Sequence, residues 1–240
     1  MSLFERSHIL LGDTGIERLQ DSHVVIAGVG GVGSYAAEAI ARLGVGKITL
    51  IDHDTVSSSN INRQLIALQS TLDQYKTEVM AARIKDINPH CQVICQQTFI
   101  DQANLPKLIA QSPHHYHSVI DAIDSLTSKT DLLAYCVSHT IPVFSSMGAG
   151  GKTDPSLISE ADLMDTSVCK LARQLRQRLK KRGVGKGIKT VYSTEVGLPP
   201  LPPQPVERGR PRAINGTVSY MPALFGLRLA GLVAKQLLNK

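Results

Sequence analysis

The chain has 240 residues and a formal net charge of +6, with 42% hydrophobic and 19% charged residues. This length fits one large α/β domain, or one domain with an appendage, and the hydrophobic fraction suffices for an ordinary buried core. The four cysteines contain no Cys-x-x-Cys pair, which argues against paired zinc ligands and against a disulfide framework. We therefore expect four reduced thiols in a cytoplasmic protein that needs no zinc.

Neither end of the sequence predicts a membrane segment. The first six residues contain no hydrophobic signal region. The apolar stretch 218–238 is interrupted by Pro222, Arg228 and Lys235, which is typical of a buried helix and unsuited to a membrane span.

Strand and helix patterns alternate along the first 150 residues. The expected strands are 23–27, 47–51, 92–97, 118–123 and 141–145, and the expected helices are 33–43, 76–87, 102–111 and 128–139. Such alternation predicts an α/β fold with a Rossmann-like, doubly wound and mostly parallel sheet. We expect residues 1–150 to form a nucleotide-binding core.

The remaining residues, 151–240, have a different character. An amphipathic helix is expected over 166–182, with apolar residues at helical spacing: Val168, Leu171, Ala172, Leu175 and Leu179. Residues 183–215 are rich in Gly and Pro, which predicts a long mobile loop without regular structure. A closing helix at about 222–239 should pack on the sheet, so that residues 151–240 complete the same domain.

This second part is also basic. Residues 151–215 contain thirteen Lys and Arg but only six Asp and Glu. A basic region beside a nearly neutral core favours a polyanionic partner such as a nucleic acid. The charge alone fits a solvated helix face and loop equally well.

A glycine-rich turn follows the first expected strand. Gly28, Gly30 and Gly33 come directly after an apolar run, and Asp52 ends the next strand. Glycines let backbone N–H groups approach a phosphate, and a helix N-terminus adds a favourable dipole. The pattern predicts a nucleotide site but leaves open whether the nucleotide is NAD or ATP.

Two cations and a further carboxylate favour ATP. Arg63 and Lys76 follow the second strand, and Asp124 follows the fourth. The carboxyl ends of parallel strands meet at one edge of a sheet, where ligands bind. A triphosphate that loses pyrophosphate needs cations on the leaving group and Mg²⁺ held by a carboxylate.

The order and spacing of these residues resemble the ubiquitin-activating-enzyme-like adenylyltransferases. The matching motifs are Gly-x-Gly-Gly-x-Gly, Asp-x-Asp, Asn-x-x-Arg-Gln, a downstream Lys and Asp-x-x-Asp, and they cover residues 1–150. The resemblance implies an ATP-binding adenylyltransferase core in which Asp124 holds Mg²⁺. It implies an ATP site formed by Gly28, Gly30, Gly31, Gly33, Asp52, Asp54, Asn60, Arg63, Gln64 and Lys76.

Motifs in the second part resemble one branch, the bacterial tRNA threonylcarbamoyladenosine dehydratases. They are Gly-Ala-Gly-Gly-Lys-Thr-Asp-Pro at 148–155, Leu-Ala-Arg at 171–173, Tyr-Ser-Thr-Glu at 192–195 and Asn-Gly-Thr-Val at 215–218. The resemblance implies ATP-driven adenylylation of a carboxylate in the modified nucleoside, followed by ring closure and release of AMP. It also implies a homodimer in which Arg6 reaches the ATP of the other subunit, and tRNA binding by Lys170, Arg173, Arg176, Lys180 and Lys181.

Other functions remain open from the sequence. The same chemistry would serve to adenylylate the C-terminus of a ubiquitin-like sulfur-carrier protein, and a glycine turn alone also fits an NAD-dependent oxidoreductase or a non-catalytic scaffold. Some relatives carry a cysteine where Thr190 and Val191 stand, so the resemblance makes a persulfide role doubtful and leaves a sulfur-transfer partner open.

Several residues also have structural interpretations. Asp54 could cap a turn, and Asn62 is interpreted as a turn residue. We expect Asp121 to be the buried, structural member of its pair with Asp124. We also expect Cys169 to pack in the core and the polar segment with His114, His115 and His117 to be a solvated loop rather than a metal cluster.

Overall fold

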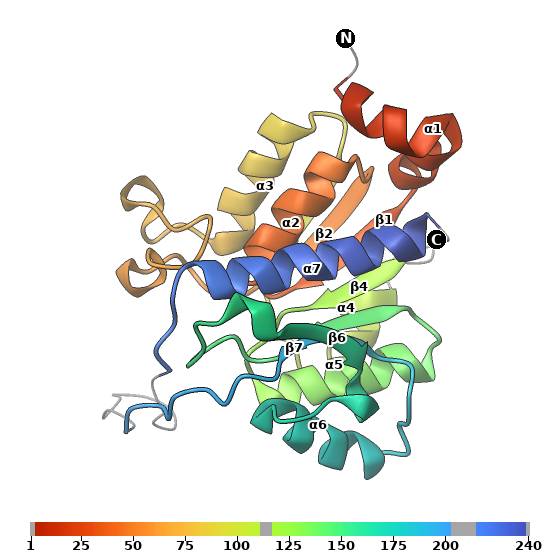
Figure 1. Ribbon diagram of the computed structural model, residues 1–240. Helices are drawn as coiled ribbons and strands as arrows, with labels where there is room; N and C mark the ends of the chain where they lie inside the picture. The colour runs from red at the N-terminus through yellow and green to blue at the C-terminus, as the bar shows by residue number, and fades with distance from the viewer. Residues whose placement is uncertain (1–2, 111–116, 203–214, 239–240) are drawn as a thin grey trace.

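The computed structural model describes residues 3–110, 117–202 and 215–238. At its centre is a seven-stranded sheet with the order β3-β2-β1-β4-β5-β7-β6 (Figure 1). The strands are β1 (His23–Ala27), β2 (Lys47–Ile51), β3 (Gln92–Gln96), β4 (Ser118–Asp121), β5 (Val143–Ser146), β6 (Ile158–Asp162) and β7 (Lys189–Ser193). Every neighbouring pair is parallel except β6 with β7, which confirms the expected α/β, mostly parallel sheet.

Helices cover both faces of this sheet (Figure 1). They are α1 (Glu5–Gln20), α2 (Gly33–Leu43), α3 (Lys76–Ile87), α4 (Leu105–Ala110), α5 (Leu126–Ser138), α6 (Lys170–Lys180) and α7 (Tyr220–Leu237). Short 3₁₀ turns lie at η1 (Ser58–Asn60), η2 (Gln69–Thr71), η3 (Pro155–Leu157) and η4 (Leu163–Asp165). In the described part of the chain, no helix is both long and apolar enough to cross a membrane.

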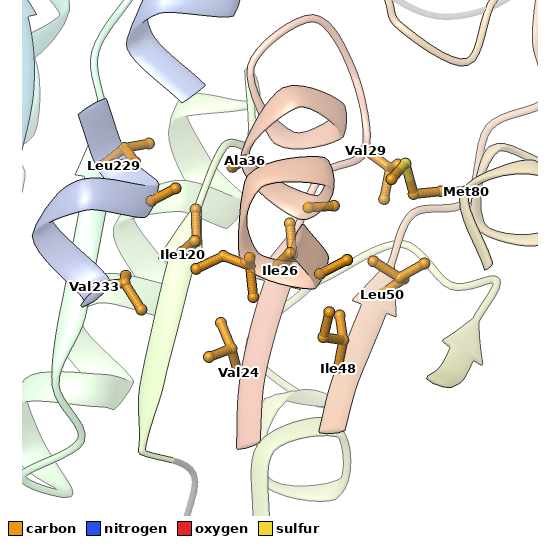
Figure 2. Packing of buried hydrophobic residues seen from close by; sticks show 14 of the residues in the cluster. Val24, Ile26, Val29, Ala36, Ile48, Leu50, Met80, Ile120, Leu229 and Val233 are labelled. Carbon is orange, nitrogen blue, oxygen red and sulfur yellow. The ribbon is translucent and has the colours of Figure 1, made fainter. Parts of the chain in front are cut away.

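The two faces of the central strands form two hydrophobic clusters, because successive side chains of a strand point to opposite sides. Val24 and Ile26 join the cluster beneath α2 and α7, and Val25 and Ala27 join the one beneath α4, α5 and α6. Figure 2 shows the first cluster, where Ile26 lies between its neighbouring strands and the covering helices. All five residues of β1 are buried, so this strand forms the centre of the core.

Parallel pairing brings the carboxyl ends of β1, β2, β4 and β5 to one side of the sheet. We call this side the carboxyl edge and define it by Ala27, Ile51, Asp121 and Ser146. In register, Ala27 pairs with both Ile51 and Asp121, and Asp121 pairs with Ser145. The turns that follow these residues are therefore neighbours, as predicted from the parallel arrangement of the strands.

The structure corrects the expected loop at 183–215. Residues 189–193 form β7, which lies between β5 and β6 in the sheet. Four of its five residues, Thr190 to Ser193, are buried, but the Gly- and Pro-rich composition around the strand conceals its signal. The stretch 203–214 of the expected loop lies outside the described residues.

Three further elements differ from expectation. Neither α1 nor β6 was predicted from the sequence. Helix α6 begins at Lys170 rather than at residue 166, because Val168 adopts a φ of 61°, which a right-handed helix does not allow. Val168 was expected on the apolar face of that helix, but its side chain is 53% exposed. Residue 111 of the helix expected at 102–111 lies outside the described residues.

Candidate active site

The glycine turn between β1 and α2 is too tight for any side chain at two positions. Gly28 has a φ of 89°, and a Cβ there would lie 2.7 Å from the carbonyl oxygen of Ala122. A Cβ at Gly33 would lie only 1.7 Å from the carbonyl oxygen of Gly28. The turn therefore presents bare backbone at the start of α2, which is the arrangement that phosphate groups bind.

The other two glycines of the motif face the loop after β2. A Cβ at Gly30 would lie 3.7 Å from Nε2 of Gln64, and one at Gly31 would lie 3.5 Å from Cγ of Arg63. The structure thus brings the glycine turn together with Arg63 and Gln64. Gln64 is buried, and its Oε1 has no hydrogen-bond partner among the described residues. Such an unpaired acceptor is costly unless a ligand or water donates to it.

Asp52 connects the tip of β2 to the glycine turn. Its Oδ2 accepts a hydrogen bond from the backbone N–H of Val29 at 2.7 Å, and its Oδ1 accepts one from the N–H of Asp54 at 2.9 Å. A carboxylate has about four acceptor positions, so both oxygens can accept further bonds from the hydroxyls of a ribose.

Lys76 is buried at the start of α3 and forms an ion pair with Asp54. Its Nζ lies 2.7 Å from Oδ2 of Asp54, and its side chain is 6% exposed against 50% for Asp54. His53 approaches the other oxygen of Asp54, with 3.2 Å between Nε2 and Oδ1. Asp54 compensates the buried ammonium of Lys76, and this role for Asp54 is additional to the predicted contact with ATP.

The loop at residues 57–64 orients the predicted phosphate-binding arginine. Oδ1 of the buried Asn60 accepts from the N–H of Ser57 at 3.1 Å, which closes the turn η1. Nη1 of Arg63 donates to the carbonyl of Ser59 and to Oδ1 of Asn62, both at 2.9 Å.

Asn62 was interpreted as a turn residue, but its side chain also forms two hydrogen bonds. Its Oδ1 accepts from Arg63, while its Nδ2 donates to the carbonyl oxygen of Thr217 at 3.0 Å. The neighbouring Gly216 accepts through its carbonyl from the N–H of Gly151 at 2.7 Å. Asn62 therefore links Arg63 to a segment that also contacts the loop after β5. The only signal in the sequence was its position beside Arg63.

The last residue of β4, Asp121, and Asp124 in the turn that follows differ as expected. Asp121 is fully buried: its Oδ2 lies 2.7 Å from Nζ of Lys129, whose side chain is also 0% exposed, and it accepts from Oγ of Ser145 at 2.7 Å. Asp124 is exposed just beyond the strand, immediately before α5. Lys129 was not singled out from the sequence, because α5 carries other polar residues beside it and the spacing does not mark Lys129 as buried.

A buried polar group that sequence reasoning did not single out lies on the loop after β5. Lys152 is 6% exposed and donates to the carbonyl oxygen of Gly148 at 2.9 Å. Burial lowers the pKa of this ammonium, an effect that Cys169 and Glu195 partly oppose. The carboxylate of Glu195 accepts from the backbone N–H groups of Thr153 and Asp154 at 2.9–3.0 Å. These bonds fix the loop at the carboxyl edge.

Arg6 lies far from the glycine turn of its own chain. It is exposed on α1, two residues after Phe4, whose ring carbons would lie 3.3 Å from a Cβ at Gly44. Gly44 follows α2 and precedes β2, so Phe4 and Arg6 are at the end of the sheet opposite to the carboxyl edge. Within the described part of the chain, no hydrogen bond or ion pair joins Arg6 to Arg63 or Lys76.

Helix α6 is basic on its exposed side. Lys170, Arg173, Lys180 and Lys181 are exposed, with Lys181 just after the last helical residue. Arg176 differs, because its Nη1 donates to the carbonyl oxygens of Thr166 and Leu163 and to the Thr166 hydroxyl. Its guanidinium therefore holds the turn before α6 in place.

The remaining expectations concern Cys169 and three histidines. Cys169 is buried and belongs to the hydrophobic cluster beneath α6, as expected. His117 is exposed, and its Nδ1 accepts from the N–H of His23 at 3.1 Å. His114 and His115 lie outside the described residues.

Comparison with known proteins gives a consistent result. The sequence matches the ThiF family over residues 4–240. A tRNA threonylcarbamoyladenosine dehydratase of Bacillus subtilis (strain 168) is 38% identical over 243 residues, covering 98% of this chain and 94% of that relative. The crystal structure of the E. coli tRNA N6-threonylcarbamoyladenosine dehydratase in complex with ATP has a TM-score of 0.88 and 39% identity, covering 98% of this chain and 93% of that one.

A second crystal structure of the E. coli dehydratase, in complex with AMP, has a TM-score of 0.86 and 38% identity, with the same coverage of both chains. The matches extend beyond the nucleotide-binding core into β6, α6, β7 and α7. The chain therefore belongs to the ThiF family, in the group formed by the tRNA threonylcarbamoyladenosine dehydratases.

Proposed function

We propose that this protein is an ATP-dependent tRNA-modifying enzyme that dehydrates threonylcarbamoyladenosine beside the anticodon to its cyclic form. The main support is the match to dehydratases over nearly the whole chain, including the basic α6, combined with a carboxyl edge suited to a nucleotide. One relative in this group is described with ATP and with AMP, the substrate and product that such a reaction requires.

The residues at the carboxyl edge fit ATP. The bare backbone at Gly28 and Gly33 suits phosphate groups. Oε1 of Gln64, which has no partner among the described residues, can accept a hydrogen bond from the ligand. In the proposed complex the N–H groups of the turn, including Gly30 and Gly31, contact the phosphates. Asp52 accepts from the ribose hydroxyls, and Asn60, Arg63 and Lys76 bind the phosphates, with Asp54 releasing Lys76 as ATP enters.

Asp124 is the proposed ligand for Mg²⁺. An exposed carboxylate at a strand end is a hard oxygen ligand of the type that Mg²⁺ prefers, while the ion keeps most of its ligands as water and phosphate oxygens. When bound, Mg²⁺ would supply charge neutralisation on the leaving pyrophosphate.

The proposed reaction has two steps. The threonyl carboxylate attacks the α-phosphorus of ATP, a P–O bond forms, and pyrophosphate leaves. The carbamoyl nitrogen then attacks the activated acyl carbon, closes the ring, loses its proton and displaces AMP. The first step needs no general base, because a carboxylate is ionised at neutral pH. Catalysis by Arg63 and Lys76 therefore comes from positioning and charge neutralisation.

The exposed cations of α6 are proposed to bind the phosphates of the tRNA. Among the described residues, no acidic side chain forms a salt bridge with any of the four exposed cations, Lys170, Arg173, Lys180 and Lys181. Arg176 was also expected to bind tRNA, and its bonds to Thr166 favour a supporting role.

The proposal includes a homodimer and a cytoplasmic location. Arg6 is at the end of the sheet opposite to the glycine turn, which supports a role at the ATP of a second subunit rather than its own. Threonylcarbamoyladenosine is found in tRNA, and tRNA is a cytoplasmic substrate. No zinc is required by the proposed chemistry.

The test uses the purified full chain with ATP, Mg²⁺ and tRNA that carries threonylcarbamoyladenosine. We expect AMP release that depends on the modified tRNA, and mass spectrometry of the digested nucleosides should show the loss of one water. The control is the same tRNA without the modification. AMP release with a ubiquitin-like carrier protein, and none with tRNA, would replace this proposal with carrier activation.

A further inference from the structure

A pocket of about 300 Å³ lies between α5 and α6. We call it the α5–α6 pocket, and it is lined by Leu126, Gln174, Gln177, Arg178 and Lys181. The last four residues are spaced i, i+3, i+4 and i+7, so they form one stripe along the helix and its end. The sequence analysis assigned no role to Gln174, Gln177 or Arg178.

The pocket is next to the carboxyl edge. Leu126 is the first residue of α5 and lies two residues after Asp124. Two residues of extended chain span at most about 7 Å, so the Cα atom of Leu126 lies within that distance of the Cα atom of Asp124, the proposed Mg²⁺ ligand. This is the scale of one nucleotide unit, so a nucleotide in the pocket would be a neighbour of one that reacts near Asp124.

Contacts between α5 and α6 hold the pocket in shape. Nη1 of Arg178 lies 3.2 Å from Oγ1 of Thr127 in the first turn of α5. One turn further, Nη2 of Arg182 lies 2.6 Å from Oδ1 of Asp131, whose side chain is 5% exposed. These two contacts, one turn apart, join the C-terminal part of α6 and the turn after it to the start of α5, next to the pocket.

The lining has the chemistry of a nucleotide site. Two carboxamides offer donors and acceptors to the edge of a base, as Asn and Gln do in nucleic-acid complexes. Arg178 and Lys181 offer positive charge to a phosphate, and Leu126 offers an apolar surface to a base plane. None of the five lining residues is acidic, and the nearby carboxylate of Asp131 is neutralised by Arg182.

We propose that the α5–α6 pocket binds a nucleotide of the tRNA that directly flanks the modified nucleoside. This inference rests on the proposed function and adds a specific subsite to it. A flanking nucleotide held there fixes the register of the anticodon loop, so that the threonyl carboxylate is presented at Asp124. Lys170, Arg173 and Lys180 provide general attraction to phosphates, whereas the pocket, which includes Lys181, provides position.

The experiment combines a change in the pocket with a change in the RNA. Gln177→Glu keeps the size of the side chain and adds a negative charge to the pocket. Gln92→Glu, at the exposed start of β3 and so at the opposite end of the sheet, is the matched control with the same change in net charge. Both are measured with modified anticodon stem-loop RNA, either intact or with one abasic nucleotide at the 5′ or the 3′ neighbour.

For the wild type, we expect one of the two abasic positions to raise the Kd about tenfold. Gln177→Glu should raise the Kd of the intact RNA by a similar factor, and in this variant the same abasic position should cause no further loss. Gln92→Glu should behave as the wild type, and the Kd of ATP should stay unchanged in both variants.

Two results would overturn the inference: Gln177→Glu binds intact RNA as tightly as Gln92→Glu, or the abasic penalty is the same in Gln177→Glu as in the wild type. Failure of the proposed function would appear separately, because the wild type would then release no AMP with intact modified tRNA.

Discussion

Nζ of Lys129 lies 2.7 Å from Oδ2 of Asp121, and both side chains are fully buried. The pair joins the end of β4 to α5, and Asp121 also accepts from the hydroxyl of Ser145 on β5. Three elements of the carboxyl edge are thus held by one carboxylate. Asp121 therefore determines where Asp124 and the start of α5 lie.

Removing one member of this pair should be strongly destabilising. Lys129→Met leaves the carboxylate of Asp121 buried without its cation, and we expect it to lower the free energy of unfolding by about 3–5 kcal/mol. The double variant Asp121→Asn/Lys129→Met leaves no buried charge and should recover a large part of this loss. Urea denaturation of the wild type, the single variant and the double variant measures both effects. Equal stability of the two variants would contradict a role of charge compensation.

Asp124→Ala should abolish AMP formation while leaving the Kd of tRNA within about twofold of the wild type. The physical reason is that the carboxylate acts on the leaving pyrophosphate through Mg²⁺ and contributes little to the attraction of an anionic RNA. The control is Asp86→Ala, which removes an exposed carboxylate on a different element, α3. Release of AMP by Asp124→Ala at the wild-type rate would refute the metal assignment.

Asn62→Ala should lower kcat more than it changes the binding of ATP. The substitution removes the bond that orients the Arg63 guanidinium and the bond to the carbonyl of Thr217. A loss of about tenfold in kcat corresponds to the loss of one such oriented contact. Ser70→Ala, at an exposed position after the same loop, should show no effect. If Asn62→Ala raises only the KM of ATP, Asn62 acts in binding and not in orientation.

Salt dependence should separate the cations of α6. Neutralising Arg173 should weaken tRNA binding and reduce the slope of log K against log salt concentration by about 0.7–0.9 for each lost phosphate contact. Arg176→Gln should change this slope little and instead lower stability by about 1–3 kcal/mol, because its bonds to Thr166 and Leu163 are lost. Filter binding at several salt concentrations, with thermal denaturation of each variant, tests both statements. Equal slope changes for the two variants would show that Arg176 also contacts RNA.

The thiols should react slowly at neutral pH. Burial raises the pKa of Cys91 to about 11 and that of Cys136 to about 12, and burial also raises the pKa of the more exposed Cys95. Since the thiolate is the reactive form, alkylation should be slower than in the unfolded chain, whose thiols ionise near pH 8.5. Ionisation of these thiols therefore favours the unfolded state as the pH rises above about 8.5.

Peptide mapping after iodoacetamide treatment at pH 8 tests this expectation. Cys95 should be labelled before Cys91 and Cys136, and the guanidinium-denatured chain should label all of them at similar rates. Preferential labelling of Cys136 in the native protein would contradict its burial.

The fold of residues 1–150 was well predicted because its signals are local. The glycine turn directly follows the apolar run of β1, and Asp52 directly follows β2. Asp121 ends β4 and Asp124 lies in the turn after it, and parallel pairing brings these strand ends together. The difference between Asp121 and Asp124 was also predictable. The spatial partners were not, because the ion pair with Lys129 and the link from Asn62 to Thr217 join residues that no spacing rule connects.

The second half was predicted less well, for a physical reason. β7 lies between Gly- and Pro-rich stretches, so its strand character appears only when β5 offers a partner. The start of α6 was displaced because Val168, although apolar, occupies a left-handed backbone conformation. Hydrophobic spacing cannot detect such a break.

The place of β7 between β5 and β6 has a consequence for synthesis of the chain. In the described sheet β6 pairs only with β7, although it precedes β7 by 26 residues. During translation, β6 therefore leaves the ribosome with no strand to join until residues 189–193 follow. Until then the edge of β5 is also open, and an open strand edge invites pairing with other chains. Premature termination before β7 should yield an aggregation-prone fragment, even though such a fragment contains every residue proposed to bind ATP.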